Sequence, residues 1–152
     1  MTAFDPRNPD YEAAVRDSFA RQGLMATLGA SLVAVGPGWV EIAADYHDGL
    51  SQQYGFFHGG VIGAIADSAG GYAAFSLMPP ESNVLTVEYK MNIVAPGRGE
   101  RLIARGAVIR PGRTLTVSRA DVFAIDGGAE TLCATMLQTL MCLAAAAHRP
   151  AG

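Results

Sequence analysis

The sequence predicts a single α+β domain in which an antiparallel sheet wraps around one long central helix. Residues 60–77 are apolar on every face of a helical projection, which is typical of a helix buried all round. Strand-like segments follow this helix and are separated by turns rich in glycine and proline. With 152 residues, 50% of them hydrophobic, the chain is long enough for one domain with an extensive core.

The elements before the central helix are predicted from capping residues, apolar periodicity and turns. Residues 8–24 open with a capping-type Asn-Pro-Asp sequence and carry spaced apolar residues, so they predict an amphipathic helix. Two strand pieces, at 28–35 and 39–46, flank a Gly-Pro-Gly turn. A polar and then aromatic loop over 47–57 leads into the central helix.

Beyond the helix, four segments have strand character, at 84–94, 101–109, 114–125 and 130–143. Turns of Ala-Pro-Gly, Arg-Pro-Gly-Arg and Asp-Gly-Gly separate them. We expect these strands to form an antiparallel meander that covers the helix. No repeat or linker divides the chain, so we expect one domain over residues 1–152. Its ends would be a helical segment at 1–24 and a frayed tail at 144–152.

Composition argues against several classes of protein. The net charge of −3 gives no reason to expect a nucleic-acid partner. The apolar run over 59–78 approaches the length of a membrane span, but five glycines and an aspartate disfavour that interpretation. His47 and His148 lack partners at ligand spacing, so we expect no metal site.

The compartment is predicted from the N-terminus and the cysteines. The first 16 residues are charged and lack the apolar core of a secretory signal. Cys133 and Cys142 fall in one predicted strand, where they would lie roughly 30 Å apart, beyond disulfide reach. A reducing, cytoplasmic setting is the simpler interpretation.

Asp67 is the one formally charged residue between Gly49 and Pro80. A carboxylate on a buried helix is costly to desolvate unless it is hydrogen-bonded or functional. Backbone donors or a hydroxyl such as that of Ser68 could hold it for purely structural reasons. We favour a catalytic role, because buried acids with perturbed pKa values cluster at functional sites.

A set of motifs around this aspartate resembles a known family. His-Gly-Gly at 58–60, Asp67 nine residues after the histidine, and Asn-Ile-Val-Ala-Pro at 92–96 resemble the hotdog-fold acyl-CoA thioesterases of the phenylacetate-pathway (PaaI) type. The similarity extends over about residues 25–143. It implies the hotdog fold, an acyl-CoA substrate, no metal or redox cofactor, and a homodimer or a dimer of dimers.

The resemblance also implies roles for individual residues. Asp67 would be the nucleophile or the general base, and the Gly60 amide would polarise the thioester carbonyl. Gln52 and Thr86 would orient the attacking group. The family usually has asparagine at the position of Gln52, so its neighbour Gln53 is an alternative source of this amide.

Helix geometry adds an inference that the motif does not contain. Nine residues of helix rise about 13.5 Å, so Asp67 and the Gly59 and Gly60 amides of one helix cannot meet at one carbonyl carbon. We therefore predict an active site shared between two subunits. The glycines lack Cβ atoms and lie at the positive end of the helix, so they suit an oxyanion site. Tight helix packing is an alternative explanation for them.

Three further residues are predicted to contact substrate. His58 precedes the helix and lies too far from Asp67 for proton transfer, so we expect it to orient substrate or make a structural hydrogen bond. Residues 98–119 contain six arginines but only one acidic residue, Glu100. Arg110 and Arg113 flank a turn and could bind the phosphates of CoA, or they could belong to a solvated strand face.

Other functions are weaker matches. A hotdog dehydratase or hydratase would need its acid and histidine in a different arrangement, and a non-catalytic acyl-CoA-binding module would not need Asp67. A relaxed nucleophile elbow around Ser68 is disfavoured, because the helical pattern continues through it. We make no prediction of which acyl group the substrate carries, because the aromatic residues near the helix could line an aryl pocket or form core.

Overall fold

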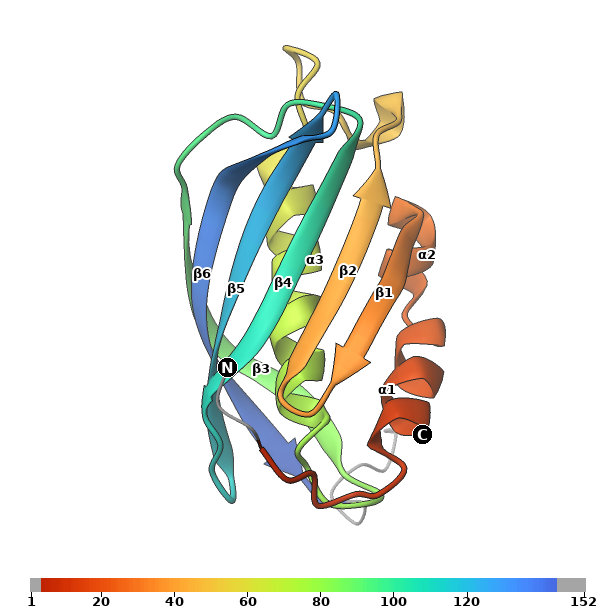
Figure 1. The fold of residues 1–152 in the computed structure, drawn as a ribbon, viewed down its shortest axis with the longest axis vertical. Coiled ribbons are helices and arrows are strands. Elements are labelled where there is room, and N and C mark those ends of the chain that lie inside the picture. Colours follow the sequence, from red (N-terminus) through yellow and green to blue (C-terminus); the bar gives the residue numbers. More distant parts are fainter. Residues whose placement is uncertain (1–3, 145–152) are drawn as a thin grey trace, which may run out of the picture.

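A computed structural model describes residues 4–144 and confirms the predicted α+β hotdog architecture. One six-stranded antiparallel sheet wraps around the long helix α3 (Figure 1). The elements in chain order are α1 (Tyr11–Ala20), α2 (Gly23–Leu28), β1 (Ala30–Gly36), β2 (Trp39–Asp45), the 3₁₀ turn η1 (Asp48–Leu50), α3 (Gly59–Phe75), β3 (Asn83–Ile93), β4 (Arg101–Arg110), β5 (Leu115–Asp126) and β6 (Ala129–Leu143).

The N-terminal segment forms two helices rather than the single helix predicted over residues 8–24. Gln22 adopts an extended backbone between them, and α2 continues to Leu28, which the sequence had suggested as the start of a strand. Gly29 then takes a left-handed conformation, φ 65°, which commonly ends a helix. The apolar alternation around Leu28 therefore belongs to a short helix whose Met25 and Leu28 are buried in the core.

The strand order is β1-β2-β4-β5-β6-β3, so only part of the predicted meander forms. The hairpin between β5 and β6 turns through Gly127 and Gly128, both at positive φ, as in a type I′ turn. The prediction that β3 is the hairpin neighbour of β4 is wrong. Residues 94–100 instead carry the chain across the sheet, and β3 pairs with β6 at the far edge. Glycine and proline mark where a chain turns, but they do not specify which strand it will pair with.

The central helix is confirmed to within two residues of its predicted ends. It is buried against the concave face of the sheet, where it packs on β2, β4 and β5. Its most buried side chains are Ile62, Ile65, Ala66, Ala69, Ala73 and Ala74. None of the helices within residues 4–144 is long and apolar enough to cross a membrane. Residues 145–152, including His148, lie outside the described part of the chain.

The edge strand β3 is unusual for its apolar exposure. Leu85, Val87, Tyr89 and Ile93 are each about half exposed, at 53%, 52%, 50% and 50%. Its backbone pairs with β6 on one side only. Exposed apolar edges of this length are normally paired or covered, so β3 is the part of the sheet best suited to contact another chain.

Candidate active site

Asp67 lies in the middle of α3 with its side chain partly buried. The Thr86 hydroxyl on β3 donates to Asp67 Oδ1 at 2.7 Å, and Gln138 Nε2 on β6 donates to the same oxygen at 3.1 Å. Gln138 Nε2 also lies 3.2 Å from the Asp67 carbonyl oxygen. Ser68 does not hold the carboxylate, because its hydroxyl bonds to Gln22 Oε1 at 3.3 Å. Oδ2 therefore has no donor among residues 4–144.

The electrostatics of Asp67 suit a reactive carboxylate. Burial raises the pKa of Asp67, and the hydrogen bonds from Thr86 and Gln138 oppose that rise by stabilising the charged form. A partly desolvated carboxylate with a raised pKa is a stronger base and nucleophile than one in water. The arrangement can attack a carbonyl carbon or deprotonate a water molecule.

The pocket beside Asp67 is small, about 70 Å³, and mostly polar. Its walls come from the α1–α2 junction, α3 and β3, and are formed by Gln22, Asp67, Ser68, Gly71, Tyr72, Val84 and Thr86. The Tyr72 hydroxyl lies 3.2 Å from Ser18 Oγ, which ties α1 to the central helix. The N-terminal helices thus close one side of the carboxylate pocket.

The N-terminus of α3 forms a second site. His58 caps the helix, and its Nδ1 accepts a hydrogen bond from the Gly60 N–H at 2.8 Å. This is a structural hydrogen bond of the kind predicted as one alternative for His58. The Gly60 amide, predicted as the oxyanion donor, is therefore engaged in this conformation. The Gly59 N–H next to it has no acceptor within residues 4–144.

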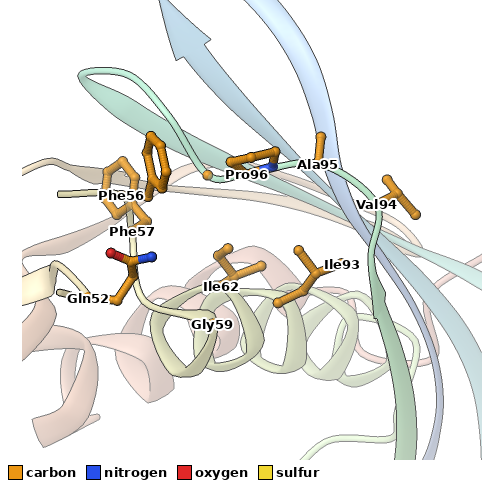
Figure 2. Close-up of a pocket in the computed structure, with 10 residues that line it drawn as sticks. Gln52, Phe56, Phe57, Gly59, Ile62, Ile93, Val94, Ala95 and Pro96 are labelled. Atoms are coloured by element: carbon orange, nitrogen blue, oxygen red, sulfur yellow. The ribbon is translucent and has the colours of Figure 1, made fainter. Parts of the chain in front are cut away.

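Gly59 lines a larger apolar pocket of about 530 Å³. Figure 2 shows its lining residues, with Gln52 lying between Phe57 and Gly59, Ile62 on α3 close to Gly59, and Ile93 beyond Ile62. Gln52 Oε1 accepts from the Tyr54 backbone N–H, so its Nε2 remains available to a ligand. Of the two predicted amides, Gln52 lines this pocket. Gln53 is exposed and does not line it.

The two pockets share no lining residue. Eight residues of rigid helix, about 12 Å of rise, separate Gly59 from Asp67. The fold therefore brings Thr86 to Asp67, and Gln52 to Gly59, but leaves these two pairs apart within one chain. Within residues 4–144, no group of three or more histidine, cysteine, aspartate or glutamate side chains is placed to hold a metal ion.

Acidic side chains neutralise more of the arginines between residues 98 and 119 than the sequence suggested. Within residues 4–144, acids pair with four of the six arginines, as Arg98–Asp126, Arg101–Asp45, Arg105–Glu41, Arg105–Glu130 and Arg119–Asp121. Arg110 and Arg113 have no ion pair within residues 4–144 and line neither pocket. Their turn, between β4 and β5, lies at the opposite end of the sheet from the loop that precedes α3 (Figure 1).

The aromatic residues near α3 divide between core and pocket. Phe57 is buried and packs edge-on against Tyr46 with 5.2 Å between ring centroids. Phe56 lines the apolar pocket, whereas Tyr54 is 75% exposed. Tyr72 is buried and stacks edge-on against Phe19. These aromatic residues therefore do not all line a pocket, and they do not all belong to the core.

The sequence interpretation missed Gln138 and Gln22. Gln138 comes from a strand 71 residues beyond Asp67, and no local motif connects the two. One signal was present, because Gln138 stands between Met136 and Leu140 at a position where the alternation of β6 requires an inward apolar side chain. A polar residue at such a position usually has a specific partner.

Comparison with known proteins places these features in a family. The model of the thioesterase superfamily matches residues 54–131, just over half of the chain. A solved thioesterase family protein from Silicibacter pomeroyi is 52% identical, with a TM-score of 0.87 over 88% of this chain and 98% of that one. The Escherichia coli PaaI protein of the phenylacetic acid degradation operon has the same fold at 16% identity, with a TM-score of 0.77 over 96% and 97% of the two chains.

A curated relative gives a more specific comparison. The 1,4-dihydroxy-2-naphthoyl-CoA hydrolase of Listeria monocytogenes is 26% identical over 95 residues, which are 62% of this chain and 77% of that protein. The fold and the matched families together define a hotdog-fold thioester hydrolase. The chain belongs to the thioesterase superfamily, and the PaaI-type resemblance predicted from its residues is confirmed.

Proposed function

We propose that this protein hydrolyses acyl-CoA thioesters to a free acid and CoA, with Asp67 as nucleophile or general base. The observation that carries this proposal is the carboxylate itself. Asp67 is partly buried and held at Oδ1 by Thr86, while Oδ2 is left without a donor within residues 4–144. CoA is chosen as the thiol because the PaaI-type motifs imply it and because the Listeria relative is named a CoA hydrolase.

The chemistry has two versions that use the same atoms. Asp67 Oδ2 attacks the thioester carbon to form a mixed anhydride, which water then hydrolyses, or a water molecule attacks and gives its proton to Asp67. In both versions the C–S bond breaks, its electron pair leaves with sulfur, and the CoA thiolate is protonated. Incorporation of oxygen-18 from labelled water into Asp67 during a single turnover would identify the anhydride route. Label in the product acid alone, together with no acyl-enzyme trapped by hydroxylamine, would identify the water route.

The first turn of α3 is the proposed oxyanion site. The Gly59 N–H has no acceptor among the described residues and borders the apolar pocket, whereas the Gly60 N–H predicted from the sequence becomes available if His58 turns away. Free amides and the positive end of the helix macrodipole would stabilise the tetrahedral oxyanion. Gln52 Nε2 points into the same pocket and is proposed to orient the attacking group together with Thr86.

A complete site needs both pockets, so we propose that it forms between two subunits. Both pockets border β3, since Val84 and Thr86 line the Asp67 pocket while Ile93 and Val94 line the Gly59 pocket. Antiparallel pairing of two β3 edges about Tyr89 would place residue 85 opposite residue 93, and so would join each Asp67 pocket to the other subunit's Gly59 pocket. It would also cover the exposed apolar edge. A dimer of dimers remains a proposal, to be tested by light scattering.

The same antiparallel arrangement gives a place for CoA. It would bring the β4–β5 turn of one subunit to the end of the sheet where the other subunit's Gly59 pocket opens. Arg110 and Arg113 on that turn are proposed to bind the CoA phosphates. Replacing them with alanine should raise KM for acyl-CoA but not for the acyl N-acetylcysteamine thioester, which lacks phosphates. An equal rise for both substrates would contradict the assignment.

The proposed chemistry uses a carboxylate, amides and water, and so requires no metal or redox cofactor. We also propose a cytoplasmic location, where acyl-CoA is made and where the two unpaired cysteines would stay reduced.

Thiol release from a panel of acyl-CoAs tests the proposal. The wild-type protein should release free CoA, and Asp67→Asn should reduce the rate by at least about 100-fold, the scale of general acid–base catalysis. Asp17→Asn, which changes an acid on α1 away from both pockets, should behave as wild type. Absence of thiol release from every thioester tested would overturn the assignment, and formation of an enoyl or hydroxyacyl thioester would indicate a dehydratase or hydratase instead.

A further inference from the structure

Gln138 is a polar side chain between two apolar ones on the inward face of β6. It is fully buried, and so are Met136 and Leu140, the neighbouring inward residues on β6. Burial of a carboxamide is unfavourable unless its hydrogen bonds are satisfied. The donor half of the amide meets this requirement, because Nε2 bonds to Asp67 twice, at Oδ1 and at the backbone oxygen. Because both partners are acceptors, only the NH₂ side of the amide can face them.

The central helix makes room for this side chain. A Cβ atom on Gly70 would lie 2.1 Å from Gln138 Oε1 and 2.8 Å from Ser118 Oγ, closer than any real contact. Ser118 is the register partner of Gln138 on β5, and both Ser118 Oγ and Gln138 Oε1 are buried without a hydrogen-bond partner within residues 4–144. A glycine in mid-helix and two buried polar groups are each unfavourable for stability alone. Their coincidence beneath Asp67 indicates a role at the site.

We propose that Gln138 is a positioning residue for hydrolysis, which with Thr86 holds Asp67 by Oδ1 and so presents Oδ2 to the thioester. This inference rests on the proposed function. Two donors on one carboxylate oxygen, from β3 and from β6, prevent the side chain from exchanging its oxygens. The oxygen without a donor is then the one that attacks carbon or accepts a proton.

The surroundings of Asp67 contain few other groups that could produce a pH effect. Tyr72 is the other titratable side chain in its pocket, and Gln22, Ser68, Val84 and Thr86 carry no charge. On β3, Glu88 accepts a hydrogen bond from Thr139, the outward neighbour of Gln138, and Lys90 bonds to Asn92. A change in the titration of Asp67 on altering Gln138 would therefore report their mutual hydrogen bond.

The test compares Gln138→Met with Leu140→Met, a volume-conserving change at the next inward position of β6. Gln138→Met removes the donor and so should raise the pKa of Asp67, move the acid limb of the pH–rate profile to higher pH, and lower kcat by about 10- to 100-fold with little change in KM. Leu140→Met should change none of these. The pKa of Asp67 is followed by carbon-13 NMR of the carboxyl groups, with Asp67→Asn to assign the signal.

Gln138→Glu provides a second variant of nearly the same shape in case Gln138→Met does not fold. A second carboxyl group beside Asp67 should couple to it, so that the two titrate as a pair with one apparent pKa raised, and activity should be confined to a narrower pH range. An unchanged Asp67 titration and acid limb in either folded variant, with only stability reduced, would overturn the positioning role. The NMR titration does not require turnover, so it tests the Gln138 contact even if no thioester is hydrolysed, a result that would count against the proposed function alone.

Discussion

Asp67 is harder to ionise in the folded protein than in the unfolded chain, because burial raises its pKa above the ordinary value of 3.8. A raised folded-state pKa means that the native state binds the proton more tightly. The stabilisation that comes from this tighter proton binding is fully present below the pKa of Asp67 in the unfolded chain. It is lost as the pH rises through the pKa of Asp67 in the folded protein. At neutral pH the ionised Asp67 therefore lowers the free energy of unfolding.

Asp67→Asn should accordingly stabilise the protein at pH 7 while it removes activity. The amide keeps an oxygen that can accept from Thr86 and Gln138, but carries no charge to desolvate. We expect a gain of about 0.5–2 kcal/mol, the usual range for stabilising substitutions. Urea denaturation from pH 3 to pH 8 measures it, and the gain should shrink towards the acid end. A gain that does not vary with pH would show that the charge of Asp67 is not its source.

The oxyanion assignment is tested by a pair of substitutions at Gly59. Proline is well tolerated as the first residue of a helix, and the preceding His58 has φ −64° and ψ 140°, which suits a following proline. Gly59→Pro removes the free N–H, whereas Gly59→Ala keeps it and adds a Cβ 3.1 Å from the mobile end of Ile93. We expect kcat to fall by about 100- to 1000-fold for proline and by less than about tenfold for alanine.

Circular dichroism and thermal melting should show that both Gly59 variants fold. If Gly59→Pro retains activity, the Gly60 amide predicted from the sequence is the donor, and His58 must release it during the reaction.

Single residues were predictable where a local pattern identified them. Asp67 stood out as the one charge in an apolar run, and the hydrogen bond from Thr86 joins two residues that the motif named together. The alternation of β6 marks Gln138 as unusual, but its contact with Asp67 could not be identified, because that contact depends on the pairing of β6 with β3 and β5, which sequence spacing does not encode. For the same reason the acids that neutralise Arg105 were missed, since they come from β2 and β6.

Among the elements, α3 was the most predictable because its apolar character extends over 17 residues. Its glycines nevertheless differ in how closely neighbouring side chains approach them, which the sequence does not reveal. Close packing is the ordinary explanation for a glycine inside a buried helix, and it would apply to Gly63 and Gly70 alike. A Cβ on Gly63 would make an ordinary contact of 3.5 Å with Met91, but Gly70 lies directly against Gln138.

Gly63→Ala and Gly70→Ala therefore form a matched pair on one helix. Alanine is the better helix former by about 1 kcal/mol, so Gly63→Ala should raise the free energy of unfolding by up to that amount. Gly70→Ala should lower it by about 1–3 kcal/mol, since the new methyl group displaces Gln138. Urea denaturation measures both. Equal effects of the two substitutions would mean that Gln138 can move away without penalty.

Strand pairing was less predictable than strand existence. All four strands after α3 form close to their predicted bounds, yet β3 joins the sheet at the opposite edge from the position that a meander requires. Turn residues are local, whereas the choice of partner depends on how the sheet closes around α3. The error has a functional consequence, because a meander would have paired β3 with β4, whereas in the described residues β3 pairs with β6 alone and leaves its other edge open.

At the scale of the whole molecule, one chain holds two separate pockets, which we propose to be the two halves of a shared site. The Asp67 pocket and the Gly59 pocket lie at different levels of the same helix, and both border the open edge of the sheet. Helix geometry alone predicted this separation, since rise per residue is fixed. The sequence did not show that a single edge strand borders both pockets, because that depends on where β3 docks.

A mixed dimer distinguishes a shared site from two independent ones. One chain carries Asp67→Asn and the other Gly59→Pro, so each is inactive as a homodimer. In a mixed dimer with shared sites, one site carries both substitutions and the other carries neither. Random exchange between equal amounts makes half of the dimers mixed, with one intact site in each, so activity should recover to about a quarter of wild type.

The mixture is prepared by co-refolding the two variants or by co-expressing them with different tags, and thiol release is measured after tandem purification. Purified mixed dimers should have about half of the wild-type activity, since one of two sites is intact. Sites contained within single chains predict no recovery, because every chain then carries a defect of its own. If the variants recover activity only when they are mixed, the carboxylate and the oxyanion donor act from different subunits, as the separation of Gly59 and Asp67 on one helix requires.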